Sequence, residues 1–133
     1  MTPGRYSSFG MKWILFLFLS PVAAMADPIE GVWQTHPAKD GGYGLVRIAP
    51  CGTGFCGDVV GQFDASGREI VADRHRVIEQ VVPKGATYGG GRVVNPETGR
   101  SYAARLILEG DRLDVGGCLL GICRSGGIWR RVD

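Results

Sequence analysis

The sequence predicts an all-β protein, folded as a single eight-stranded antiparallel barrel that follows a cleaved signal peptide. Three observations lead to this prediction. Short runs rich in β-branched and aromatic residues recur roughly every 8–15 residues, most of the 22 glycines lie between or within them, and no segment keeps a helical period. We expect a barrel rather than an open sheet because closure leaves no exposed strand edges.

The first 26 residues have the features of a secretory signal peptide. Met11-Lys12 forms a positively charged start, an apolar run follows at 13–19, and Ala24-Met25-Ala26 matches the A-x-A pattern of a cleavage site. A membrane anchor is the alternative, but it needs roughly 20 apolar residues to cross a bilayer. We therefore expect cleavage and no membrane span in the mature protein, with Met11 as an alternative start to Met1.

Cleavage after Ala26 leaves one domain, residues 27–133, in the periplasm or outside the cell. Arg5 and Lys12 leave with the signal, so 13 of the 15 basic residues remain against 13 acidic residues. A formal charge of zero gives no electrostatic basis for binding nucleic acid. The domain is expected to be a soluble exported protein with no nucleic-acid partner.

The expected strands are bounded by residues that interrupt a β-ladder. Pro50 is expected to end the second strand, and Pro83-Lys84-Gly85 the fourth. The three glycines at 89–91 predict a bulge or a sharp bend in the fifth. The one long connection, residues 64–76, is polar and is expected to be an exposed loop with a short helix. The eight strands are expected at 29–35, 43–49, 55–63, 77–82, 86–94, 101–109, 112–118 and 122–132.

The four cysteines form two pairs with the same four-residue spacer. A protein of this size with an even number of cysteines, exported to an oxidising compartment, is expected to form disulfides. Each spacer suits a hairpin turn, which favours Cys51–Cys56 and Cys118–Cys123. Crossed pairings that join the two hairpins, and a zinc site with four thiolates, are the alternatives.

The two ends of the domain carry residues that suit closure of a barrel. Gly31 and Trp33 open the first strand, and Trp129 and Arg131 close the last one. A guanidinium from the last strand is expected to lie over the buried indole of Trp33, a cation–π contact worth about 0.5–2 kcal/mol.

Together these segments resemble a known bacterial family. The similarity rests on Gly31-Val32-Trp33, on the stretch 45–52 with Cys56-Gly57, on the 95–102 turn, and on 117–124 with Trp129-Arg130-Arg131. The chain is similar to a family of small exported proteins known as a domain of unknown function, over essentially the whole of 27–133. The resemblance implies a lipocalin-like, calycin-type barrel and no established activity.

Two patterns suggest chemistry but fit a structural interpretation better. Residues 52–57 match G-x-G-x-x-G, yet a dinucleotide site needs a helix after this motif, and a strand follows here. His36 and His75 lie in separate polar segments, so neither a metal site nor a cofactor is predicted.

A catalytic centre is not predicted either. Asp73-Arg74-His75 lacks a nucleophile, because Ser66, Ser101 and Ser125 have no elbow motif around them and the cysteines are expected to be bridged. No pair of acids stands on an apolar strand face where its pKa would be raised. The protein is therefore expected not to be an enzyme.

The leading functional hypothesis is a carrier for a small apolar or amphipathic ligand. Tyrosines at the barrel mouth bind an apolar body while their hydroxyls find polar partners, and arginines there suit an anionic head group. The alternatives are that the aromatic residues fill the core, and that the barrel is a non-catalytic scaffold whose 64–76 loop binds a protein partner. The candidate ligand-binding residues are Trp33, Tyr43, Tyr88, Tyr102, Arg47 and Arg92.

Overall fold

The computed structural model describes residues 27–70 and 74–133, so the predicted signal segment lies outside the described part of the chain. The described residues form nine strands and no helix. The strands are β1 (Gly31–Gln34), β2 (Tyr43–Cys51), β3 (Gly54–Phe63), β4 (Glu69–Ile70), β5 (Arg76–Lys84), β6 (Thr87–Val94), β7 (Ser101–Glu109), β8 (Arg112–Leu119) and β9 (Ile122–Arg131).

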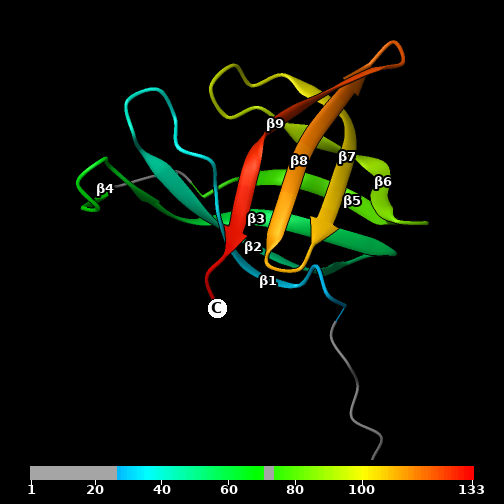
Figure 1. Ribbon diagram of the computed structural model, residues 1–133, viewed down its shortest axis with the longest axis horizontal. Helices are drawn as coiled ribbons and strands as arrows, with labels where there is room; N and C mark the ends of the chain where they lie inside the picture. The colour runs from blue at the N-terminus through cyan, green and yellow to red at the C-terminus, as the bar shows by residue number, and fades with distance from the viewer. Residues whose placement is uncertain (1–26, 71–73) are drawn as a thin grey trace, which may run out of the picture.

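Eight of these strands close into an antiparallel barrel, which confirms the predicted fold class. The order around the sheet is β2-β1-β9-β8-β7-β6-β5-β3, and β2 also pairs with β3, so the sheet returns to its first strand. The two-residue strand β4 pairs only with β3 and lies outside the ring, at one side of the barrel (Figure 1). Apart from the β1–β9 and β3–β5 pairs, each barrel strand pairs with its neighbours in sequence.

Several sequence-based boundaries need correction. The connection after β3 contains the short strand β4 and, in its described residues, no helix. Pro50 and Pro83 do not end their strands, because each lies one residue before the strand end, where a missing N–H costs little of the ladder. The predicted bulge at the three glycines is confirmed, since the β6–β7 register shifts between Gly89 and Arg92.

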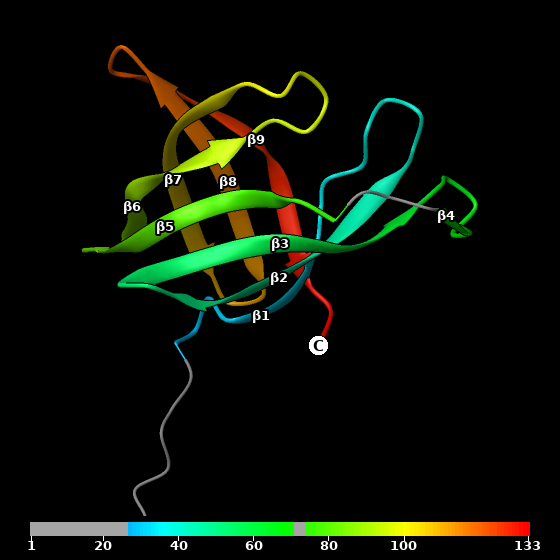
Figure 2. The ribbon, with the colours of Figure 1, turned by 180° about the vertical axis from the view of Figure 1, so that it is seen from behind.

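The connections alternate between the two ends of the barrel. We call one end the base: it holds the N-terminal segment 27–30, the C-terminus and the β2–β3, β5–β6 and β7–β8 turns. We call the other end the mouth: it holds the β1–β2, β3–β4, β6–β7 and β8–β9 connections. Figures 1 and 2 show the mouth loops above the barrel and the C-terminus below it.

The core fills the base half of the barrel. Alternating positions on the strands point inward, as at Val46 and Ile48 in β2 and at Leu113 and Val115 in β8. Large fully buried side chains occupy the lower interior. They are Ile29, Trp33, Val46, Ile48, Ile78, Val81, Leu106 and Leu113.

The barrel closes where β1 meets β9. Trp33 pairs with Arg131 in the ladder, and the guanidinium carbon of Arg131 lies 4.4 Å from the centroid of the Trp33 ring. Arg131 also donates hydrogen bonds to the carbonyls of Glu30 and Pro28 and to the carboxylate of Asp111. The predicted cation–π closure is present, and it is reinforced by hydrogen bonds to the N-terminal segment.

Both favoured disulfides are present. Cys51–Cys56 spans the β2–β3 turn at the base and Cys118–Cys123 spans the β8–β9 turn at the mouth. No cysteine is free, so the crossed pairings and the zinc site with four thiolates are wrong. Two disulfides in so small a domain are typical of exported proteins.

Candidate ligand-binding cavity

The mouth half of the barrel is open. A cavity of about 1250 Å³ lies at the mouth, between the β1–β2, β6–β7 and β8–β9 connections and the end of β3. A narrower cavity of about 100 Å³ continues below it and shares part of its lining. Eight residues line both spaces and mark the passage between them: Thr35, Gly44, Gln62, Val93, Val94, Pro96, Val115 and Trp129.

The floor of this cavity is apolar. Val93, Val115 and Trp129 are buried, belong to the hydrophobic core and line the cavity from β6, β8 and β9. Tyr102 adds a half-buried ring from β7. The floor is therefore the upper surface of the core, which is rigid and pre-formed.

Two glycines determine the shape of the cavity. Gly44 lies on the inward face of β2, and a Cβ there would meet neighbouring atoms only at 3.5 Å or more. At Gly117 a Cβ would lie 2.8 Å from Cβ of Tyr102, so only glycine lets the tyrosine ring lie across β8. The missing side chains leave space at the mouth that larger residues would fill.

Trp129 carries a buried donor without a protein acceptor. Its side chain is 9% exposed, and its indole N–H has no acceptor among residues 27–70 and 74–133. The other indole, that of Trp33, donates to the carbonyl of Ile29 at 3.0 Å. Because buried donors are nearly always satisfied, an acceptor inside the cavity is expected for Trp129.

The rim carries charges of both signs. Arg124 pairs with Gly117 in the β8–β9 ladder, and Gly117 pairs with the buried Ala104, so Arg124 shares the inward face. It lines the cavity and forms no ion pair with any described residue. An inward cation of this kind suits an anionic group.

Two of the three acids that line the cavity, Asp40 and Asp64, by contrast, accept hydrogen bonds within turns. Asp40 accepts from the amide of Gly42, and Asp64 accepts from the Ser66 hydroxyl and from the amides of Ser66 and Arg68. The Ser66 hydroxyl, followed by the Arg68 amide, lowers the pKa of Asp64 below its ordinary value. These hydrogen bonds hold the loops in place.

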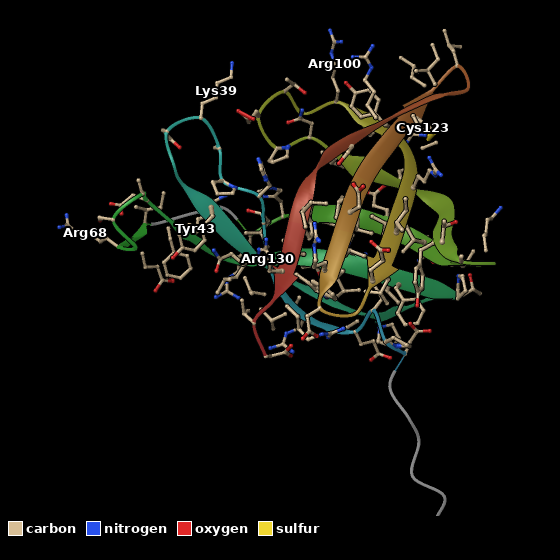
Figure 3. The ribbon with its side chains drawn as sticks, viewed as in Figure 1. Lys39, Tyr43, Arg68, Arg100, Cys123 and Arg130 are labelled. Carbon is tan, nitrogen blue, oxygen red and sulfur yellow. A yellow bond between two sulfur atoms is a disulfide. The ribbon has the colours of Figure 1, made fainter. Side chains whose placement is uncertain are left out.

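Only two of the six candidate ligand-binding residues line the cavity. Tyr102 lies at the floor, and Tyr43 lies at the wall, where its ring stacks on Phe63 with centroids 5.2 Å apart. Figure 3 shows Tyr43 at the start of β2, next to the β1–β2 connection at the mouth.

The other four do not line it. Trp33 is fully buried in the core, and Arg47 and Arg92 are exposed, with Arg92 donating to the Ser101 hydroxyl. Tyr88 is buried toward the base, where its hydroxyl donates to the carboxylate of Asp27. Burial, followed by this hydrogen bond, raises the pKa of Tyr88 well above its ordinary value. The bulge at 89–91 separates this tyrosine from the mouth half of β6.

The histidines do not meet. His36 is exposed on the rim, where its Cβ packs against Gly127. His75 is half-buried just before β5, and its carbonyl accepts from the amide of Val59. In the part of the chain that the structure describes, no group of three or more metal-ligating side chains is found. Asp73 lies outside the described residues.

The sequence analysis missed the residues that give the cavity its polarity. Trp129 was assigned only to closure, and Arg124 was not singled out. Trp129 is visible in the sequence as a large aromatic residue in the last strand, but no local pattern places Arg124 on the inward face. Which face a residue occupies depends on the β9 register, and the irregularity between Asp114 and Gly116 shifts that register.

Comparison with known proteins agrees with this fold. Across residues 27–70 and 74–133, no helix is long and apolar enough to cross a membrane. No curated protein matches the chain. A solved structure described as "Protein HP1028 from the human pathogen Helicobacter pylori belongs to the lipocalin family" is similar, with a TM-score of 0.61 and 14% identity over 82% of this chain and 85% of that chain. At this identity the likeness shows a lipocalin-like fold. Residues 31–131 match the family model "Uncharacterized protein conserved in bacteria (DUF2147)", and the chain belongs to that family.

Proposed function

We propose that the protein is an exported, non-catalytic binding or carrier protein for a small amphipathic ligand, held in the mouth cavity. One observation carries the proposal: a space of about 1250 Å³ opens directly above a buried apolar floor. Ligand sites are commonly pre-formed cavities of roughly 300–1000 Å³ with apolar walls and a few placed polar groups. The lipocalin-like barrel supports the same interpretation at the level of the fold.

The lining indicates which parts of a ligand would lie where. The apolar part would pack on Val93, Val115 and the ring of Trp129. A hydrogen-bond acceptor on the ligand would satisfy the indole N–H of Trp129, and an anionic group would meet the unpaired guanidinium of Arg124. A ligand with an apolar body and one acidic or strongly polar end fits this arrangement.

The shifted pKa values support a non-catalytic role. Catalytic acids and bases are usually marked by perturbed pKa values inside a cleft. Asp64 lines the cavity with a lowered pKa, but hydrogen bonds within its own turn are the cause. Tyr88, whose pKa is raised, lies away from the cavity.

A cavity-blocking variant tests the proposal. Gly44→Leu places a side chain into the open space above the floor, and Ala103→Leu adds the same bulk on the exposed face of β7, outside the cavity. The probe is 1-anilinonaphthalene-8-sulfonate, which has an apolar ring system and one anionic group. We expect the first variant to weaken probe binding at least tenfold, roughly 1.4 kcal/mol, and the control to bind like wild type.

Two further variants test the polar contacts. Trp129→Phe keeps the apolar floor and removes the donor, and a three- to tenfold weaker affinity is expected from one hydrogen bond of about 1 kcal/mol. Arg124→Gln should weaken the sulfonate probe and leave its uncharged analogue N-phenyl-1-naphthylamine unaffected. Equal probe affinity for wild type and Gly44→Leu would show that the cavity is not the binding site.

A further inference from the structure

The β8–β9 hairpin ends in an exposed apolar tip. Leu119 is 60% exposed, Leu120 is 93% exposed and Ile122 is 64% exposed. The hairpin projects beyond the barrel at its mouth end, as the orange tip in Figures 1 and 2 shows. We call these three side chains the apolar tip.

The backbone at the tip makes leucine an unfavourable choice. Leu119 pairs with Ile122, so Leu120 and Gly121 form a two-residue turn, and both have positive φ, 54° and 82°. Such turns favour asparagine, aspartate or glycine, because a bulky side chain at positive φ is strained. Leu120 therefore costs the fold stability while its side chain gains no burial. A residue that is both strained and unburied indicates a role outside folding.

A disulfide lies directly behind the tip. Cys118 and Cys123 are cross-strand partners in the last pair before Leu119 and Ile122. The bridge keeps the two strands paired up to the turn. The apolar tip is thus held as a fixed projection from the barrel.

The charges around the tip favour an anionic surface. Residues 116–125, which form the mouth end of the hairpin, include Arg124 and no aspartate or glutamate. Figure 3 shows Lys39 and Arg100 pointing away from the barrel at the same end as the hairpin. Aliphatic side chains flanked by cations match the boundary between anionic head groups and acyl chains.

We propose that the apolar tip inserts into a lipid surface that carries anionic head groups, with the cavity mouth facing the membrane. A narrow convex tip suits a fluid bilayer, whereas a stable protein interface needs roughly 800 Å² of complementary surface from each partner. The tip residues also line the cavity, so a ligand would pass between the membrane and the barrel along them. The docking itself does not depend on the proposed ligand-binding function.

Vesicle co-flotation tests the proposal with protein produced from the full chain, its N-terminus established by mass. The vesicles contain phosphatidylethanolamine and phosphatidylglycerol, or phosphatidylcholine alone. Leu120→Asn suits the positive φ, so we expect its unfolding midpoint to equal or exceed that of wild type while its partition coefficient falls at least fivefold. Val132→Asn is the matched control, because Val132 is 48% exposed at the base; it should partition like wild type.

The charge contribution has its own test. Arg100→Gln should weaken binding to the phosphatidylglycerol vesicles and leave binding to phosphatidylcholine unchanged. The proposal is overturned if wild type does not float with either vesicle, or if Leu120→Asn floats as well as wild type. Tip-dependent capture of a protein without vesicle binding also overturns it. If the protein binds vesicles but not the fluorescent probe, membrane docking is supported and the ligand-binding function is contradicted. If it binds the probe but not vesicles, the ligand-binding function is supported and membrane docking is contradicted.

Discussion

Gly31 lies directly beneath the guanidinium of Arg131. A Cβ on Gly31 would be 2.6 Å from Nη1 of Arg131 and 2.8 Å from Oδ1 of Asp133, and the backbone there has a φ of 139°. The absence of a side chain lets Nη1 reach the carbonyl of Glu30 at 2.7 Å while the guanidinium covers Trp33. The N-terminal glycine and the C-terminal arginine are therefore one structural unit, 100 residues apart in sequence.

Gly31→Ala is expected to destabilise the barrel by about 1–3 kcal/mol, because it combines a strained φ with displacement of Arg131. Urea unfolding measures the loss. Gly110→Ala is the control, since Gly110 also has a positive φ, 60°, but a Cβ there meets nothing within 4 Å. A loss no larger than that of Gly110→Ala would show that contact with Arg131 adds nothing.

Arg131→Met is expected to cost about 2–3 kcal/mol, because it keeps the length of the side chain but removes the hydrogen bonds to Glu30 and Pro28 and the charge over Trp33. Thermal or urea unfolding is the measurement. Arg130→Met is the neighbouring control: Arg130 is exposed (Figure 3), so a change within about 0.5 kcal/mol is expected. Similar losses for both variants would contradict closure by Arg131.

The two disulfides are expected to differ in their contribution. Each closes a short loop, which the chain-entropy account values at roughly 2 kcal/mol. Replacing Cys51 and Cys56 by serine should cost about 1–2 kcal/mol more than replacing Cys118 and Cys123, because Cys56 is buried and its serine hydroxyl would lose water. Urea unfolding of the two double variants decides this; equal losses would show that the Cys56 site accommodates a hydroxyl.

Tyr88 is expected to make the stability of the protein depend on pH in the alkaline range. Its pKa is raised in the folded state from an ordinary value of 10.0, so the folded protein holds this proton more tightly than the unfolded chain. The resulting stability is complete below about pH 10 and is lost as the pH rises toward the folded pKa. Tyr88→Phe should be about 1 kcal/mol less stable than wild type near neutral pH, and the difference should narrow above about pH 10.

Urea unfolding at a series of pH values measures this difference. A gap between wild type and Tyr88→Phe that stays constant from about pH 8 to about pH 11 would contradict coupling between folding and the Tyr88 proton.

The fold could be predicted from the sequence because the residue patterns that specify it lie within single strands and turns or at the two ends of the domain. Val46 and Ile48 in β2, and Leu113 and Val115 in β8, lie at alternating buried positions, and each strand carries that period within itself. The spacers inside the cysteine pairs match hairpin turns, so both disulfides were assigned correctly. The errors at Pro50 and Pro83 arose because proline removes one donor without preventing pairing at a strand end.

The cavity residues were harder to predict from the sequence, because the direction in which a side chain points depends on the register between paired strands. Tyr43, Tyr88 and Tyr102 are equivalent as residue types, yet the bulge at 89–91 and the hydrogen bond from Tyr88 to Asp27 leave only Tyr43 and Tyr102 at the cavity. The irregularity between Asp114 and Gly116 likewise decides that Arg124 faces inward. A register shift of one residue moves a side chain to the other face of the sheet, and no local sequence pattern indicates such a shift.

The sequence by itself determined the all-β class, the strands that form the barrel, the two disulfides and the closure between Trp33 and Arg131. These features follow from short segments with a strand period, from turn residues between them, and from an aromatic residue in the first strand that matches an arginine in the last. Only the tertiary structure decided that the base half is filled, that the mouth half is open, and that Trp129, Arg124 and the apolar tip meet at the opening. The physical reason is that a cavity is the volume left after side chains from all strands are placed, and bulges distant in sequence set that placement.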